Sequence, residues 1–144
     1  MIHLVTGGSG SGKSAYAEQC ILDFGGTRRV YIATMQPFGA EGQARIARHR
    51  KMRAAKQFST IECYTNLKEV ELEPGSDVLL ECMSNLTANE IFDPSGAGKA
   101  RAEEEILAGV SRLAHQARNL VLVTNEIFSD VYRYEEETKI GRAH

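Results

Sequence analysis

Cysteine is scarce in this chain of 144 residues, and its three copies, Cys20, Cys63 and Cys82, are odd in number and far apart. No C-x-x-C pair occurs, so the sequence favours neither a disulfide framework nor a zinc site. Net charge is also small, because 17 basic and 19 acidic side chains leave only −2. Such a balance gives no general attraction to nucleic acid or to a membrane surface. We therefore expect a cytoplasmic protein with reduced thiols and no nucleic-acid partner.

Long apolar runs are missing as well. No stretch approaches the roughly 20 apolar residues of a membrane span, and no basic, apolar and small-residue leader precedes the first strand-like run. Internal repeats, linkers and low-complexity tracts are not evident. With 42% hydrophobic and 25% charged residues, the composition predicts one compact soluble domain over residues 1–144, neither exported nor membrane-spanning.

Strand-like and helix-like stretches alternate along the chain. The strand-like runs are Ile2–Thr6, Arg29–Thr34, Phe58–Cys63, Val78–Cys82 and Leu120–Thr124. Helical patterns cover Lys13–Phe24, Glu41–Lys56, a stretch from Ser84 to before Asp93, and Lys99–Ala117. Ser84 is a candidate N-cap for the third of these. The fourth places Ala102, Ile106, Val110, Leu113 and Ala117 along one stripe, which we expect to face the core. This alternation predicts an α/β fold with a mainly parallel sheet flanked by helices.

A glycine-rich loop joins the first strand to the first helix. It matches G-x-x-x-x-G-K-[ST] through Gly7, Gly12, Lys13 and Ser14 and spans Gly7, Gly8, Ser9, Gly10, Ser11, Gly12, Lys13 and Ser14. Backbone N–H groups and a helix N-terminus there favour a polyphosphate. Lys13 is expected to reach the β- and γ-phosphates, and Ser14 to bind Mg²⁺. The alternative is an ordinary glycine turn that caps a helix.

Acidic residues follow two later strand-like runs. Glu81 ends one of them, at the carboxyl edge where parallel sheets bind ligands, and so is a candidate Mg²⁺ ligand. The alternative for Glu81 is a surface carboxylate after a buried strand. Glu126 is a weaker candidate by the same reasoning.

The second helical stretch is unusually basic. Six of the seventeen basic residues lie within twelve positions there, at Arg45, Arg48, Arg50, Lys51, Arg53 and Lys56. Most such runs are solvated helix faces. However, Arg45, His49 and Arg53 fall at four-residue spacing and hence on one face, where they can meet phosphates together. The spacing alone does not decide whether His49 is a structural residue or a reactive one.

These motifs resemble the bifunctional adenosylcobinamide kinase / adenosylcobinamide-phosphate guanylyltransferase family of cobalamin synthesis. The similarity runs from Leu4 to about Glu126 and is carried by the glycine-rich loop, Tyr31-Ile32-Ala33-Thr34, Arg45-Ile46-x-x-His49, Thr60-Ile61-Glu62, Leu79-Leu80-Glu81-Cys82 and Thr124-Asn125-Glu126. The resemblance implies a RecA-like P-loop fold, homotrimers, ATP and GTP as substrates with Mg²⁺, and adenosylcobinamide and its phosphate as acceptors.

The resemblance also implies roles for particular residues. His49 is expected to take up GMP as a covalent intermediate, and Lys13 to act in catalysis with it. Nucleotide contacts are implied for Ala33, Thr34, Met35, Arg50, Lys51, Met52, Arg53, Glu62 and Glu81, besides the glycine-rich loop. Two departures stand out: Gly10 replaces an arginine common in the family, and the sequence after Glu126 differs. We therefore expect a single P-loop domain that lacks its C-terminal helix and strand.

Three rival interpretations of the sequence remain. One is a P-loop kinase that acts on another small alcohol, with His49 only binding phosphate or serving the structure. Another is a RecA-like nucleic-acid-binding ATPase whose basic segment, residues 45–56, contacts the polymer. The net negative charge and the lack of aromatic residues within that segment argue against the second. A third possibility is a chain that only binds nucleotide.

Overall fold

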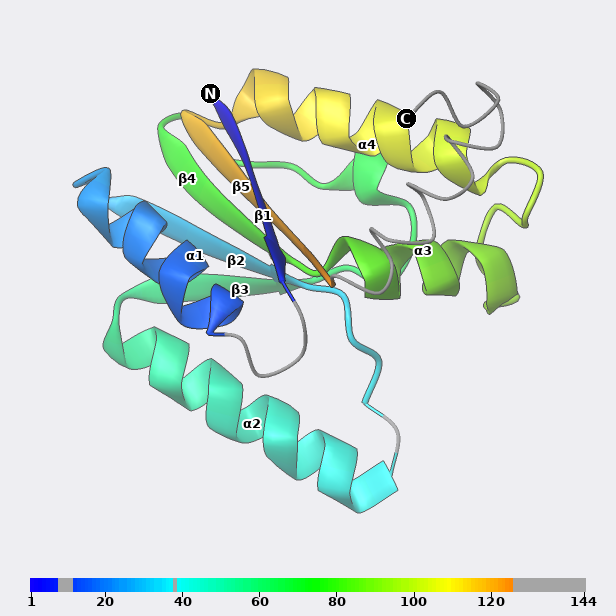
Figure 1. The fold of residues 1–144 in the computed structure, drawn as a ribbon, viewed down its shortest axis with the longest axis horizontal. Helices are drawn as coiled ribbons and strands as arrows, with labels where there is room; N and C mark the ends of the chain where they lie inside the picture. Colours follow the sequence, from blue (N-terminus) through cyan, green and yellow to red (C-terminus); the bar gives the residue numbers. More distant parts are fainter. Residues whose placement is uncertain (8–11, 38, 126–144) are drawn as a thin grey trace, which may run out of the picture.

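The computed structural model describes residues 1–7, 12–37 and 39–125, and it is built around a five-stranded sheet (Figure 1). The strands are β1 (Ile2–Gly7), β2 (Arg28–Ala33), β3 (Phe58–Glu62), β4 (Ser76–Glu81) and β5 (Asn119–Asn125). Their order across the sheet is β1-β5-β4-β2-β3, and every pairing is parallel. This confirms the predicted fold class, and each strand lies within two residues of its predicted bounds.

Both faces of the central strands are buried, which explains why these strands are continuous apolar runs in the sequence. Along β4, Val78 and Leu80 pack on one face with Leu120 and Leu122 of β5. The side chain between them, Leu79, packs on the other face with alternate residues of β5 and with Ala17 and Ile21. The sheet therefore has two hydrophobic cores, one on each side.

Helices flank the sheet. They are α1 (Lys13–Asp23), α2 (Gly39–Ala55), α3 (Met83–Phe92) and α4 (Ala102–Gln116), with a short 3₁₀ turn η1 (Leu67–Glu69). The helices other than α2 contribute residues to the two cores. The predicted stripe of α4 is confirmed, because Ala102, Ile106 and Leu113 are buried and Val110 and Ala117 pack against the same core. None of the helices in the described ranges is both long and apolar enough to cross a membrane.

Ser84 corrects one detail of the prediction. The N-cap of α3 is Cys82, in extended backbone, and it makes no side-chain cap bond. Ser84 lies in the first turn of the helix, where its hydroxyl is 3.2 Å from the hydroxyl of Thr124 on β5. Its polar group therefore joins α3 to the sheet and does not begin the helix.

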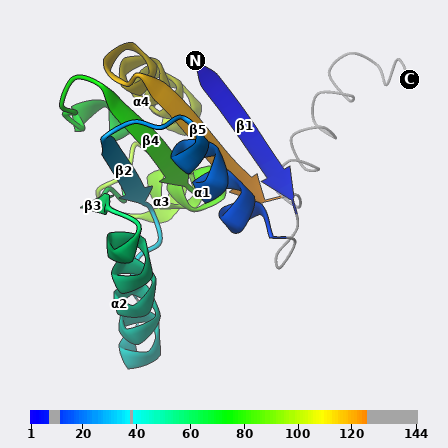
Figure 2. The same ribbon diagram turned by 90° about the vertical axis from the view of Figure 1, so that its left-hand side faces the viewer.

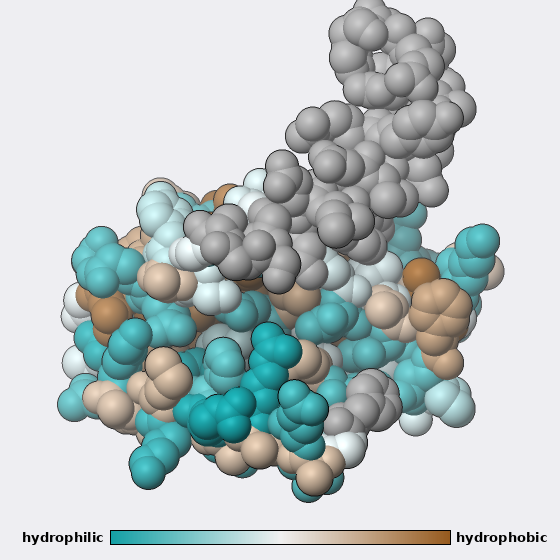
Figure 3. Space-filling model, turned by 60° about the horizontal axis from the view of Figure 1, so that its bottom comes forward, coloured by the Kyte–Doolittle hydropathy of each residue, from teal (hydrophilic) through white to brown (hydrophobic). Residues whose placement is uncertain are grey.

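Helix α2 differs from the other helices in how little of it is buried. It lies beside β3 and extends beyond the sheet (Figure 2). Among its residues only Arg53, near its C-terminal end, is buried. Figure 3, with this side of the molecule brought forward, shows mostly hydrophilic side chains with scattered apolar ones. Apart from the half-buried Gly42 and Ile46, the rest of α2 is exposed, and its basic side chains other than Arg53 remain accessible.

Cys63 follows β3 and is 7% exposed within the core, where its thiol donates to the carbonyl oxygen of Thr65 at 3.3 Å. Burial, with a smaller effect of the Glu90 charge, raises the pKa of this thiol from 9.0 to about 11. Between pH 9.0 and about 11 the thiol ionises in the unfolded chain but stays neutral in the folded protein. The free energy of unfolding therefore falls as pH rises through this range.

We expect Cys63→Ala to remove this part of the pH dependence. The melting temperature of the unaltered protein should fall more between about pH 8 and about pH 10.5 than that of the variant. Thermal unfolding followed by circular dichroism at both pH values measures the difference. An equal fall in the two proteins would contradict the assigned pKa.

Candidate active site

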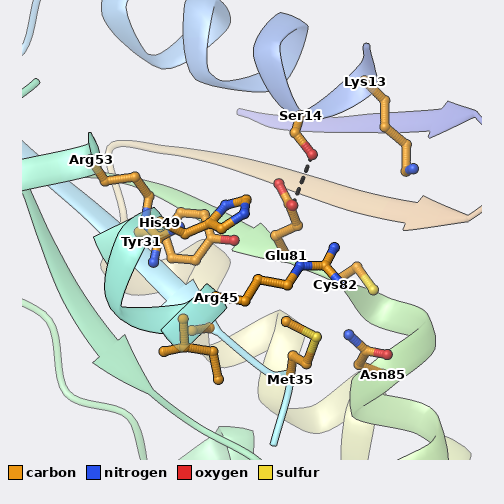
Figure 4. A pocket seen from close by; sticks show the side chains of 12 residues that line it. Lys13, Ser14, Tyr31, Met35, Arg45, His49, Arg53, Glu81, Cys82 and Asn85 are labelled. Atoms are coloured by element: carbon orange, nitrogen blue, oxygen red, sulfur yellow. Dashed lines mark hydrogen bonds between the residues drawn. The ribbon is translucent and has the colours of Figure 1, made fainter. Parts of the chain in front are cut away.

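A cavity of about 280 Å³ opens at the carboxyl ends of β2 and β4, where residues from α1, α2 and α3 meet the sheet (Figure 4). Parallel α/β sheets bind their ligands at this edge. The residues that line the cavity are Lys13, Ser14, Tyr31, Ala33, Met35, Arg45, Ile46, His49, Arg53, Glu81, Cys82 and Asn85. They include basic, acidic and hydroxyl groups, so the cavity suits an anionic ligand more than an apolar one.

The start of α1 supplies one wall of this cavity. β1 ends at Gly7, and the N-cap of α1 is Gly12, whose φ of 82° lies in the left-handed region that glycine adopts without strain. Lys13 and Ser14 follow at once and line the cavity. The N-terminus of α1 therefore contributes its partial positive charge beside the Lys13 ammonium. Gly8, Ser9, Gly10 and Ser11 lie outside the described residues.

Ser14 and Glu81 meet across the cavity, although 67 positions separate them in the chain. The Ser14 hydroxyl donates to Glu81 Oε2 at 2.8 Å. The other oxygen, Oε1, is buried and has no hydrogen-bond partner among the described residues. A hydroxyl and a carboxylate with a free acceptor oxygen fit Mg²⁺, which prefers oxygen ligands. The two candidate metal residues are thus brought together, whereas Glu126 lies outside the described residues.

Helix α2 contributes the residues that were predicted to share a face. Arg45, His49 and Arg53 all line the cavity, which confirms the four-residue pattern. The His49 imidazole projects from α2 into the cavity (Figure 4) and is exposed, so that a ligand can reach it. Arg53 is only 5% exposed, and its guanidinium carbon lies 3.5 Å from the centre of the Tyr31 ring. The two arginines therefore sit one helical turn on either side of His49.

The predicted residues at the end of β2 and just after it have two different roles. Ala33 and Met35 line the cavity. Thr34 is fully buried, and its hydroxyl accepts from the backbone N–H of Cys82 at 2.8 Å and lies within 3.0 Å of the carbonyl oxygens of Glu81 and Cys82. The Thr34 side chain thus holds the end of β4 in place, beside Glu81.

Gly7 and Gly12 line a neighbouring hollow that shares Lys13, and four other predicted residues lie away from the cavity. Arg50 forms an ion pair with Glu62, and both line a separate hollow with Ala54, Phe58 and Thr60. Lys51 and Met52 are exposed on α2 and line neither space. The structure does not bring these four to the Lys13 cavity.

Four cavity residues were not singled out as site residues from the sequence, namely Tyr31, Ile46, Cys82 and Asn85. Ile46 is the neighbour of Arg45 on α2. For Tyr31 a signal was present, because alternate residues of a strand share a face and Tyr31 precedes Ala33 by two positions. Cys82 and Asn85 come to the cavity at the turn from β4 into α3. No spacing rule in the sequence pointed to them.

Comparison with known proteins identifies the family of this chain. The family model described as cobinamide kinase / cobinamide phosphate guanyltransferase matches residues 3–143. The bifunctional adenosylcobalamin biosynthesis protein CobU of Escherichia coli is 35% identical over 140 residues, covering 88% of this chain and 76% of that protein. CobU of Salmonella typhimurium is 36% identical with the same coverage. CobP of Pseudomonas aeruginosa is 33% identical over 131 residues, 72% of its length. The chain therefore belongs to the cobinamide kinase / cobinamide phosphate guanyltransferase family.

Proposed function

We propose that this protein is a transferase that acts twice on one acceptor. It phosphorylates adenosylcobinamide with ATP or GTP, and it then transfers GMP from GTP to adenosylcobinamide phosphate, which gives adenosylcobinamide-GDP. The observation that carries this proposal is the single cavity in which Lys13 and Ser14 of α1 face Glu81 of β4 and His49 of α2. One cavity with a phosphate-binding helix terminus and an accessible imidazole suits both reactions.

In the first reaction the acceptor hydroxyl attacks the γ-phosphorus of the nucleotide. A new P–O bond forms, the bond to the β-phosphate oxygen breaks, and the hydroxyl proton passes to solvent. Lys13 and the α1 N-terminus bind the β- and γ-phosphates and stabilise the charge that moves onto the leaving diphosphate. Ser14 and Glu81 would hold Mg²⁺, which when bound would supply further charge neutralisation at the phosphates.

In the second reaction the neutral imidazole of His49 attacks the α-phosphorus of GTP. An N–P bond forms while the bond to the bridging oxygen breaks and pyrophosphate leaves. A phosphate oxygen of the acceptor then attacks the same phosphorus, the N–P bond breaks, and His49 is released unchanged. Two displacements replace one difficult step. Arg45 and Arg53, which line the cavity on either side of His49, neutralise the α-phosphate.

We expect both products when the protein is incubated with adenosylcobinamide, ATP, GTP and Mg²⁺. Glu81→Gln should lower the rate of product formation by about 100-fold, because the amide has a similar shape but no charge to hold a metal or its water. Mass spectrometry of the products measures the reaction, and titration of GTP binding with and without Mg²⁺ gives a second readout. The Mg²⁺ dependence of GTP affinity should be lost in the variant.

Glu69→Gln is a matched control, since Glu69 is an exposed carboxylate on η1, outside the cavity. Its rate should equal that of the unaltered protein. The absence of both products in the unaltered protein would refute the proposed function. A Glu81→Gln variant with full activity and full Mg²⁺ dependence would refute only the role of Glu81.

A further inference from the structure

The contact between Arg53 and Tyr31 has features that packing alone does not require. Both side chains are buried, at 5% and 7% exposure, and both line the cavity. The guanidinium carbon lies 3.5 Å from the ring centre, as in a stacked cation–π pair. Nε of Arg53 is buried and has no hydrogen-bond partner among the described residues. A charged side chain is thus held at the cavity wall with a donor that none of the described residues uses.

The residues that line the cavity explain why the orientation of the Arg53 guanidinium must be fixed. Among the described residues that line the cavity, Glu81 is the only carboxylate, and a free guanidinium pairs readily with a carboxylate through two hydrogen bonds. A pair of that kind would occupy the charges of both groups. Stacking uses the face of the guanidinium and leaves its in-plane N–H groups available for an anion.

The Tyr31 hydroxyl adds no negative charge to the cavity. Its pKa is raised, first by burial and next by the Glu81 carboxylate, while the Arg53 guanidinium lowers it by less. A tyrosine hydroxyl is already protonated at neutral pH, and the raised pKa of Tyr31 extends that state to higher pH. A neutral ring can lie beside bound phosphates without repelling them.

We propose that Tyr31 is a positioning residue for the nucleotide: its ring fixes the Arg53 guanidinium so that the in-plane N–H donors face the phosphate groups and do not pair with Glu81. This inference rests on the proposed function, since it takes the anion to be GTP. Tyr31 itself touches no reacting atom and acts only through Arg53. No family motif or spacing rule assigns it this role.

The test is a double-mutant cycle with GTP affinity, measured by calorimetry, as the readout. Tyr31→Leu removes the ring and should weaken GTP binding about tenfold, whereas Tyr31→Phe keeps the ring and should stay within about twofold. In an Arg53→Gln background, Tyr31→Leu should change the affinity by less than about twofold. A merely structural tyrosine would weaken binding equally in both backgrounds, so that result would overturn the proposal.

Phe58→Leu is the matched control, because Phe58 is 6% exposed in the same core as Tyr31 and does not line the cavity. It should lower the melting temperature without changing GTP affinity. Arg53→Lys is a second test that leaves the Tyr31 ring intact. It keeps the positive charge but removes the planar guanidinium with its in-plane donors, so GTP should bind about fivefold more weakly.

An Arg53→Lys variant that binds GTP as the unaltered protein does would overturn the proposal. So would Tyr31→Leu with unchanged affinity. The proposed function fails by a different outcome, which is an unaltered protein that binds no GTP at all.

Discussion

Lys13→Ala is expected to lower GTP affinity about 30-fold and to reduce phosphoryl transfer at least about 1,000-fold. Lys13 begins α1 and lines the cavity, where it adds a full positive charge to the partial charge of the helix terminus. Alanine leaves the helix intact because it is a good helix former. The substitution therefore removes the charge and preserves the fold. Calorimetry with GTP and a product assay measure the two effects.

Lys68→Ala is the control for this experiment. Lys68 lies on η1, in an ion pair with Glu105 at 2.8 Å, and it does not line the cavity. Its loss should change neither GTP affinity nor turnover, and its melting temperature should stay close to that of the unaltered protein. If Lys13→Ala behaved like Lys68→Ala, the start of α1 would not be the phosphate site.

Local patterns in the sequence were enough to predict the fold and one face of the cavity. The apolar runs of β4 and β5 predicted two strands, and the structure buries both faces of each, because a strand between two cores needs no polar face. The four-residue spacing of Arg45, His49 and Arg53 placed them on one face of α2, which depends only on helix geometry. Both predictions rest on periodicities within a single element.

Features that depend on which strands are neighbours could not be predicted in this way. Thr34 binds the backbone at Cys82 because β2 lies next to β4 in the sheet, an order that no local pattern encodes. Tyr31 meets Arg53 for a similar reason, since the contact depends on how α2 returns to the sheet. The Ser14–Glu81 bond was expected in part, because both residues were placed at the carboxyl edge of a parallel sheet.

The residues that only the family resemblance implied fall into two groups, in different parts of the structure. Ala33 and Met35 line the cavity, whereas Arg50 and Glu62 pair with each other in a separate hollow. Nucleotide contacts by Arg50 and Glu62 stay predictions, as do the homotrimer and the single-domain organisation. An ion pair that forms between two such residues satisfies both charges, so sequence spacing does not reveal which partner each one will take.

The central claim is that His49 becomes covalently guanylylated. His49 is exposed within the cavity, and Arg45 and Arg53, one helical turn on either side, line the same space. Attack of the imidazole on the α-phosphorus of GTP gives a phosphoramidate, in which the GMP group is bound through nitrogen. Such a bond is cleaved readily by mild acid and largely survives alkali. The intermediate should therefore be both trapped on the protein and recognised by its lability.

The most direct measurement is incubation with Mg²⁺ and GTP labelled at the α-phosphate, followed by denaturation and detection of protein-bound label. The unaltered protein should carry label that mild acid releases, and His49→Ala should carry none. His115→Ala is the control, since His115 is exposed on α4 with Nδ1 at 2.8 Å from the carbonyl oxygen of Ser111, and it should label normally. Label that persists in His49→Ala, or that appears equally from γ-labelled GTP, would contradict the account.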